Sequence, residues 1–251
     1  MIFFIGWLVY NWRTTKTPLP ASFNESYQAI LANKINFYKQ LNEADRTIFE
    51  KRILHFLSHV KITGIGAEVE DEDRVYVAAS AIIPIFGFPN WEYNNLNEVL
   101  LYPESFNKDF NANKGGEKPV LGMVGSGAMQ HMMVLSQPSL RQGFNNNTDK
   151  NNTGIHEFVH LLDKTDGAVD GIPENLLDKQ HLLPWIKRMH ESIRQIMANR
   201  SDINPYGATD EAEFFAVVSE YFFERPDLLQ SKHPELYELL QNIFRQSPAD
   251  A

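Results

Sequence analysis

The run TGIHEFVHLLDK, residues 153–164, constrains this chain more than any other part of its sequence. Within it, His156 and His160 are four residues apart, among apolar residues whose spacing favours a helix. On a helix, residues four apart lie one turn apart and within about 40° of each other, so both imidazoles project from one face. Two neutral imidazoles in this arrangement can share one metal ion, and Zn²⁺ suits them well.

The acidic residue inside this motif suggests what the metal would be for. Glu157 follows His156 directly and lies about 100° around the helix from it. This offset keeps the carboxylate off the metal but close to a water molecule that the metal activates. We therefore predict that Glu157 is a general base. His55 and His59 are also four residues apart, but they lack an intervening glutamate and we interpret them as structural.

A catalytic zinc site needs a third protein ligand, which the motif does not supply. Position 166 is Asp, so the pattern with a third histidine six residues beyond the motif is excluded. The run GATDEAEFFAVVSEYFFERP, residues 207–226, predicts a buried helix on which Glu213 and Glu220 lie within about 20° of each other. The residues leave two alternatives open for each. Glu213 is a ligand or completes an N-cap box with Asp210, and Glu220 is a ligand or lies on a solvated edge.

Two weaker candidates lie near the motif. Asp163, three residues after His160, either orients an imidazole or is a polar residue at the end of the helix. The run MQHMMVLS, residues 129–136, is expected to be a strand in which His131 is structural. It is also a candidate for the edge strand along which an extended peptide would bind.

Hydrophobic patterning predicts one α+β domain. Helices are expected over about 43–60, 153–164, 184–199, 210–224 and 234–246, and short strands over 96–102, 120–124 and 129–136. The run VYVAASAII, residues 75–83, fits either a helix or a buried strand. The Asn-rich stretch FNNNTDKNN, residues 144–152, predicts an exposed loop.

Charge and cysteine content exclude several classes of function. The net charge is -9 over 251 residues, which disfavours a nucleic-acid partner. Cysteine is absent, which excludes a thiolate nucleophile and Cys-ligated metal and fits a reducing compartment. We therefore expect a cytoplasmic protein.

The first 17 residues form a separate apolar segment ahead of an expected domain of residues 18–251. The run MIFFIGWLVYNW, residues 1–12, is about half as long as a membrane-spanning helix and is followed by Arg13 and Lys16. Two interpretations stay open: a segment docked on the domain, or the end of a membrane anchor whose basic flank places the domain in the cytoplasm.

Two motifs together resemble a known family. HEFVHLLDK and, some fifty residues later, YGATDEAEFFAVVSEYFFERP are similar to segments of the Mlc titration factor A family of zinc-dependent peptidases. FYKQLNEADRTIFEKRILHFL and NNLNEVLLYP also resemble it, so the likeness covers about residues 37–244. The apolar segment at the N-terminus departs from the soluble pattern of that family.

The resemblance implies a gluzincin, in which two histidines and one glutamate hold Zn²⁺: here His156, His160 and Glu213. It implies a zincin-like metallopeptidase domain similar to the protease domain of anthrax lethal factor. Helices would surround a small mixed sheet, with the motif helix packed on it. It also implies that Tyr206 stabilises the oxyanion.

The same resemblance allows two functions. One is a peptidase acting on a peptide or protein substrate, either within the chain or as an aminopeptidase. The alternative is a regulatory protein that binds and sequesters a transcriptional repressor. Glu157 favours the peptidase, because a protein that only binds a partner has no need of a general base.

A truncated chain that begins at Pro18 is expected to be soluble, folded and able to bind zinc, because the motifs lie downstream. Thermal melting separates the two interpretations of residues 1–17. A fall of several degrees on truncation indicates a docked segment, because apolar surface buried on the domain is then lost. An unchanged melting temperature, with the full chain in the membrane fraction of cells, indicates an anchor.

Overall fold

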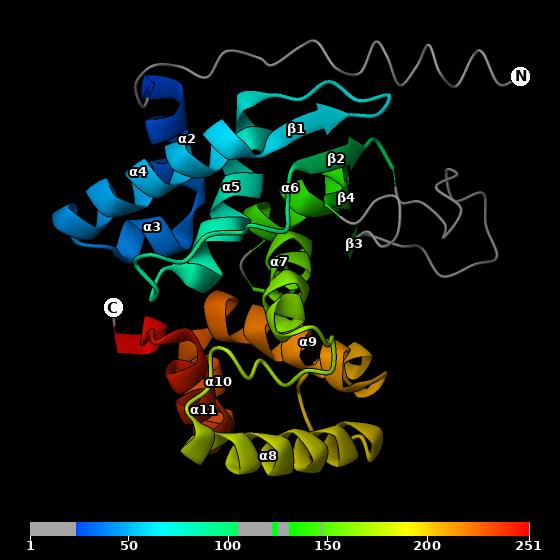
Figure 1. Cartoon of the computed structure of the whole chain (residues 1–251). Helices are drawn as coiled ribbons and strands as arrows, with labels where there is room; N and C mark the ends of the chain where they lie inside the picture. Colours follow the sequence, from blue (N-terminus) through cyan, green and yellow to red (C-terminus); the bar gives the residue numbers. More distant parts are fainter. Residues whose placement is uncertain (1–23, 105–121, 125–130, 147, 251) are drawn as a thin grey trace, which may run out of the picture.

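The strands form one small mixed sheet (Figure 1). The computed structural model describes residues 24–104, 122–124, 131–146 and 148–250. The parallel strands are β1 (Lys61–Gly64), β2 (Glu98–Tyr102) and β4 (Met132–Ser136), and β3 (Gly122–Val124) pairs antiparallel with β4. Helices surround this sheet, which confirms the expected α+β fold.

The order of the strands, β1-β2-β4-β3, corrects one expectation. Strand β4 covers residues 132–136 of the run MQHMMVLS, and it lies between β2 and β3 rather than at an edge. Among the described strands, β3 is the edge on that side of the sheet. Strand β1 was not expected, because its four residues are too few to show the alternation that marks a strand.

Helix α5 (Asp71–Ile85) contains the run that fitted either a helix or a strand. Glu70 and Asp73 cap its first turn reciprocally, and Asp73 forms an ion pair with Arg141 (2.7 Å). Every residue of α5 from Val75 onward is buried. A helix buried all round has no polar face, so its sequence could not show a helical period.

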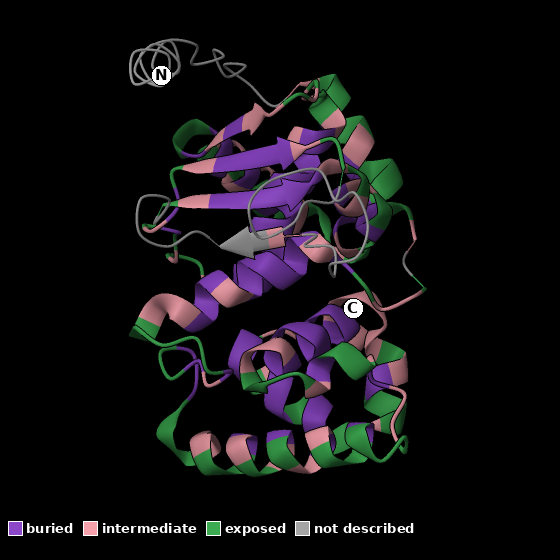
Figure 2. Cartoon of the chain, turned by 90° about the vertical axis from the view of Figure 1, so that its right-hand side faces the viewer, coloured by how far each residue is buried: buried purple, intermediate pink, exposed green. Residues whose placement is uncertain are grey.

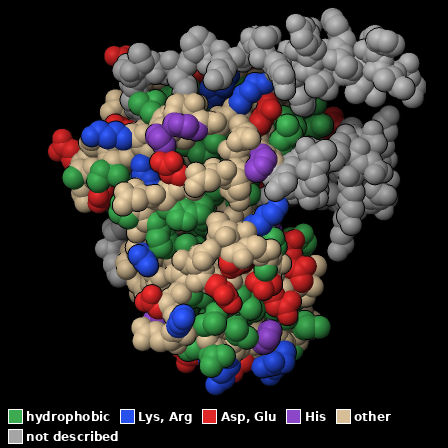
Figure 3. Space-filling model, in the orientation of Figure 1, with side chains coloured by type: hydrophobic (Ala, Val, Ile, Leu, Met, Phe, Trp, Pro, Cys, Tyr) green, Lys and Arg blue, Asp and Glu red, His purple; other side chains and the backbone are tan. Residues whose placement is uncertain are grey.

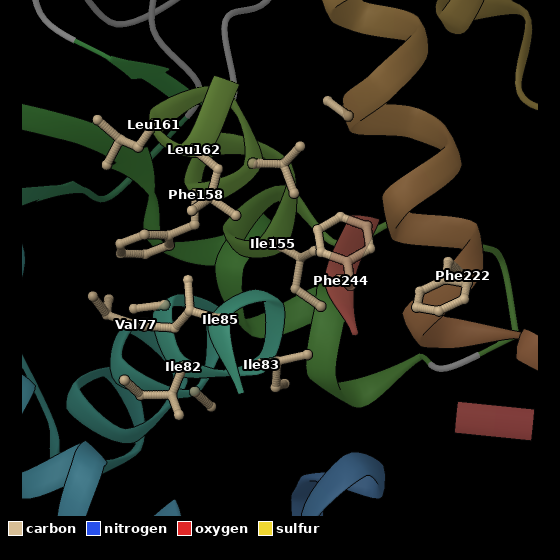
Figure 4. Close-up of a cluster of buried hydrophobic side chains, with 14 of the residues drawn as sticks. Val77, Ile82, Ile83, Ile85, Ile155, Phe158, Leu161, Leu162, Phe222 and Phe244 are labelled. Carbon is tan, nitrogen blue, oxygen red and sulfur yellow. The ribbon is translucent and has the colours of Figure 1, made fainter. Parts of the chain in front are cut away.

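Helix α7 (Thr153–Asp163) carries the motif and packs between α5 and the lower helices (Figures 1 and 2). Its apolar residues Ile155, Phe158 and Leu162 face the isoleucines of α5 in the core (Figure 4). A Cβ atom at Gly154 would lie 2.1 Å from the hydroxyl oxygen of Ser80, so the two helices meet where only glycine fits. The motif helix is therefore held close to α5 along its length.

Helix α9 (Glu211–Glu224) covers the side of α7 that faces away from the sheet (Figure 2). Phe222 of α9 stacks on Phe244 at a centroid distance of 5.6 Å, and Trp185 meets Phe215 at 5.6 Å. The other described helices are α2 (Glu25–Lys34), α3 (Asn36–Gln40), α4 (Glu43–His59), α6 (Gln137–Asn145), α8 (Lys179–Met197), α10 (Pro226–Lys232) and α11 (Pro234–Phe244). The expected helices are present, although α8 starts at Lys179 rather than near residue 184.

The division between residues 1–17 and a domain of residues 18–251 stays a prediction, because residues 1–17 lie outside the described residues. In the part of the chain that is described, no helix is both long enough and apolar enough to cross a membrane.

Asp202 ties the lower helices together just before the loop that carries Tyr206. Its carboxylate accepts hydrogen bonds from the hydroxyl of Tyr221 (2.8 Å), Nε2 of His233 (2.7 Å) and Nζ of Lys232 (2.9 Å). Burial alone would raise the pKa of Asp202, but these donors together lower it well below its ordinary value. The ionised form of Asp202 therefore contributes to stability.

Asp202→Asn is expected to lower the free energy of unfolding by about 1–3 kcal/mol at pH 7, because it removes a charge that accepts several hydrogen bonds. The native pKa lies below that of the unfolded chain, so this contribution is fully present above pH ~4 and falls as the pH drops further. Urea unfolding at pH 7, 4 and 3 measures the difference. The matched control is Asp178→Asn, since Asp178 is exposed and makes no capping hydrogen bond. A difference that grows between pH 4 and pH 3 would contradict this account.

Candidate metal centre

Helix α7 begins at a buried asparagine that links it to α9. The side-chain oxygen of Asn152 accepts a hydrogen bond from the backbone of the first turn (3.1 Å). Its backbone N–H donates to Glu220, and its amide donates to Glu224 (3.0 Å). The expectation of an exposed loop is therefore wrong at both ends of residues 144–152, since Phe144 is also buried. Asparagine directly before a helical run is an N-cap signal that could have revealed this role.

Three side chains from α7 and α9 bring one ligand atom each to the same point. The Nε2 atoms of His156 and His160 are 3.1 Å apart. Oε2 of Glu213 lies 2.9 Å from the first nitrogen and 3.6 Å from the second. In a tetrahedral zinc site with bonds of about 2.0–2.1 Å, neighbouring ligand atoms are about 3.3 Å apart. The separations and the donor types of these three residues therefore fit a metal ion of this kind.

Glu213 contacts both the capping residue Asp210 and the imidazoles of the candidate metal centre. Its backbone N–H donates to Oδ1 of Asp210 (2.9 Å), which caps α9. Its carboxylate is directed to the two imidazoles and accepts a hydrogen bond from the hydroxyl of Tyr206 (3.2 Å). Asp210 thus fixes the first turn of α9, and the side chain of Glu213 remains available for a metal.

Glu220 approaches His156 from the opposite side of the imidazole ring. Its Oε1 lies 2.7 Å from Nδ1 of His156, and Glu220 is 5% exposed. A carboxylate at this position accepts a hydrogen bond from Nδ1–H of the imidazole. The proton then stays on Nδ1, and the lone pair of Nε2 is directed at the candidate metal position. Glu220 is therefore placed to orient a ligand and not to be one, and the alternative of a solvated edge is wrong.

Glu157 is buried beside the edge strand. It is 6% exposed, and burial raises its pKa above the ordinary value for a glutamate. A Cβ atom at Gly122 of β3 would lie 2.4–2.6 Å from the side chain of Glu157, so only glycine lets the strand pass here. Gly122 could not be recognised from the sequence. A lone glycine in a short β-prone run can mark a bulge, a bend or a close contact, and the sequence does not distinguish them.

Tyr206 lies in a short 3₁₀ helix, η3 (Pro205–Ala208), directly ahead of α9. Its ring centroid is 6.0 Å from that of His156, and the side chain is partly exposed to the cleft. Burial and the nearby carboxylate of Glu213 raise the pKa of Tyr206 to about 12. The hydroxyl therefore keeps its proton at neutral pH and can donate it in a hydrogen bond.

Asp163 makes a contact that bears on the two interpretations left open by the sequence. Its Oδ2 accepts a hydrogen bond from the backbone N–H of Gly171 (2.8 Å), which holds the loop after α7. Its Oδ1 and Nδ1 of His160 are both buried and have no hydrogen-bond partner among the described residues. The contact with Gly171 supports the interpretation of Asp163 as a polar residue at the end of the helix.

These side chains line an open cleft of about 700 Å³. Its walls include Gly122 of the edge strand on one side and Tyr206 with the start of α9 on the other. The carboxylates lining it belong to Glu157, Asp170, Asp210, Glu211 and Glu213. The cleft is thus large enough for several residues of an extended peptide, and it is acidic.

The fold and this site define a zincin-like metallopeptidase domain. The family described as glucose-regulated metallo-peptidase M90 matches residues 9–245, and this chain belongs to it. An uncharacterized protein of Synechocystis sp. is 30% identical over 96% of this chain and 90% of its own length. Mlc titration factor A of Pectobacterium atrosepticum is 31% identical over 82% of this chain and 77% of its own length. The protein of that name in Escherichia fergusonii is 27% identical over 95% of this chain and 92% of its own length.

Substitutions on α9 are expected to distinguish the ligand from the residue that orients it. Glu213→Ala should reduce zinc occupancy strongly, because two imidazoles alone leave the ion under-coordinated. Glu220→Gln should weaken zinc affinity by about 10–100-fold, because Nδ1 of His156 loses its carboxylate partner. Competition with a chelator measures both affinities.

The matched control is Glu238→Ala, which removes an exposed carboxylate of α11 outside the cleft and should leave zinc affinity unchanged. Loss of zinc in Glu220→Gln together with full occupancy in Glu213→Ala would mean that the two roles are reversed.

Proposed function

We propose that this protein is a zinc-dependent peptidase in which His156, His160 and Glu213 hold the ion. The observation that carries the proposal is the triangle of ligand atoms with sides of 2.9, 3.1 and 3.6 Å, beside a buried glutamate. A zinc ion bound there would act as a Lewis acid that polarises the peptide carbonyl. It would also lower the pKa of a bound water molecule, so that a nucleophile forms at neutral pH.

Glu157 is proposed to carry the proton during hydrolysis. It accepts a proton from the attacking water as the new C–O bond forms, and it gives this proton to the leaving nitrogen as the C–N bond breaks. Its raised pKa, caused by burial, suits a group that must both take up and release a proton. Tyr206 is proposed to donate its hydroxyl proton in a hydrogen bond to the carbonyl oxygen while that oxygen carries negative charge.

The substrate is proposed to be a peptide in extended form. Strand β3 is the sheet edge nearest to Glu157, because Gly122 touches that side chain. A peptide that adds to this edge would pass its backbone over the candidate metal position. Both aminopeptidase cleavage and cleavage within a chain are compatible with a cleft open at its surface.

A second candidate function is regulatory. Several relatives are named Mlc titration factor A, a name that describes titration of a partner protein. By analogy, this chain would bind and sequester a transcriptional repressor, and catalysis would be secondary. The buried Glu157 beside the ligand triangle favours the peptidase, since binding alone gives no reason to bury a carboxylate there.

Glu157→Gln tests the peptidase proposal directly. The substitution keeps the size of the side chain and removes its basicity, so peptide hydrolysis should fall by about 10²–10⁴-fold. Zinc content should stay unchanged, because Glu157 is not among the proposed ligands. Turnover of a peptide library and zinc stoichiometry are measured on the same preparation.

Glu238→Gln is the control for this test, since Glu238 is exposed on α11 and lies outside the cleft. If wild type binds one zinc ion yet cleaves no peptide, the regulatory function replaces the peptidase proposal. If Glu157→Gln loses zinc, Glu157 supports the metal and a different residue is the base.

A further inference from the structure

A second cavity of about 550 Å³ lies between the end of α4, the end of α5 and the loop that leads to β2. It shares no lining residue with the metal cleft. On the face shown in Figure 3, histidine side chains lie beside basic and acidic ones, above a hydrophobic patch. The floor and the rim of this cavity have different chemistry, and together they indicate a class of ligand.

The floor is apolar, aromatic and fixed in place. Phe56 and Tyr93 are buried, and the ring of Trp91 meets that of Tyr93 edge-on at 4.6 Å. The hydroxyl of Tyr93 donates to the backbone carbonyl of Ala81 (2.9 Å), which prevents the ring from swinging into the cavity. Tyr93 in turn packs on Phe158 of α7 at 5.1 Å. A floor held from behind in this way is a preformed surface for a flat apolar group.

The rim carries more positive than negative charge. Lys51, Arg52, His55 and His59 line the cavity, and Glu92 is its one acidic lining residue. Oε1 of Glu92 lies 3.0 Å from Nε2 of His55, so this carboxylate is already paired with the imidazole of His55. Among the described residues, no carboxylate lies within ion-pair distance of Lys51 or Arg52. Lys51 and Arg52 therefore place positive charge at one cavity of a chain whose net charge is -9.

The guanidinium of Arg52 is held in place by hydrogen bonds to the backbone. Its guanidinium donates to the carbonyls of Phe86 (3.2 Å) and Trp91 (3.4 Å), at the end of α5 and in the following loop. Both acceptors are neutral. Burial disfavours the charged form and lowers the pKa of Arg52, and the negative charge of Glu92 offsets this effect only in part. A carboxylate, sulfonate or phosphate group would add a charge-assisted hydrogen bond to the guanidinium.

We propose that this cavity binds a small organic anion with an aromatic or flat apolar body. The ring of the ligand lies on Trp91 and Phe56, and its anionic group lies between Arg52 and Lys51. The metal cleft has a different lining, with five carboxylates and one lysine, so the two cavities present different charge to a ligand.

Naphthalene-2-sulfonate is the probe for this site, because it combines a flat ring with an anion that coordinates zinc poorly. Calorimetric titration of the full chain is expected to show one site per chain. The neutral analogue 2-naphthalenemethanol should bind at least about tenfold more weakly, since it lacks the charge that Arg52 recognises. Equal affinity for the two compounds would overturn the proposal.

Substitutions of lining residues, with one matched control, locate the site. Arg52→Gln should weaken sulfonate binding by about tenfold or more, and Lys51→Gln by about threefold, with little effect on the neutral analogue. The matched control is Lys179→Gln, an exposed lysine on α8 outside the cavity, which should bind like wild type. If Arg52→Gln does not fold, Lys51→Gln and Trp91→Leu decide the matter, and unchanged affinity in both overturns the proposal.

Glu213→Ala separates this site from the metal centre. Binding of the sulfonate should persist in that variant, since the cavity does not include Glu213. Loss of binding there would mean that the probe occupies the metal cleft, and the proposed anion site would be wrong even if the peptidase proposal were right.

Discussion

A short series of buried polar contacts holds α7 against α9, and the geometry of the candidate metal centre depends on it. Asn152 donates to both Glu220 and Glu224, and Glu220 also meets Nδ1 of His156. Asn152, His156 and Glu220 are buried, so a shift of either helix would leave them without partners. That cost, about 1–3 kcal/mol for each group, keeps the two helices in one register. The imidazole of His156 lies between Glu213 and Glu220 because of this register.

The carboxylates of α9 have separate roles because their surroundings differ. Glu213 lies at the edge of the cleft and is partly exposed, so an ion entering from solvent can reach it. Glu220 is nearly inaccessible and is committed to Nδ1 of His156 and the backbone of Asn152. Glu224 is partly buried further along the helix, and burial raises its pKa to about 8. A neutral Glu224 avoids placing another negative charge beside Glu220.

The metal cleft and the cavity beside α4 differ in charge while sharing one structural element. Helix α7 presents Glu157 and the imidazoles to the acidic cleft, and Phe158, between them in the sequence, supports the aromatic floor of the second cavity. Successive residues of a helix point about 100° apart, so one short motif can serve both surfaces. The contact between Phe158 and Tyr93 packs the motif helix on the side away from the cleft.

The sequence by itself determined the features that depend on neighbours along one helix. The spacing of His156 and His160, the offset of Glu157 and the cap at Asp210 all follow from helix geometry, which is the same in every protein. The sequence could not decide between Glu213 and Glu220. They share one stripe of α9, and their roles depend on where α7 lies relative to it. Only the tertiary structure places Glu213 on the Nε2 side of His156 and Glu220 on its Nδ1 side. It also buries Asn152 and places β3 beside Glu157. Contacts between residues more than fifty positions apart are set by packing in the core, and no local pattern records them.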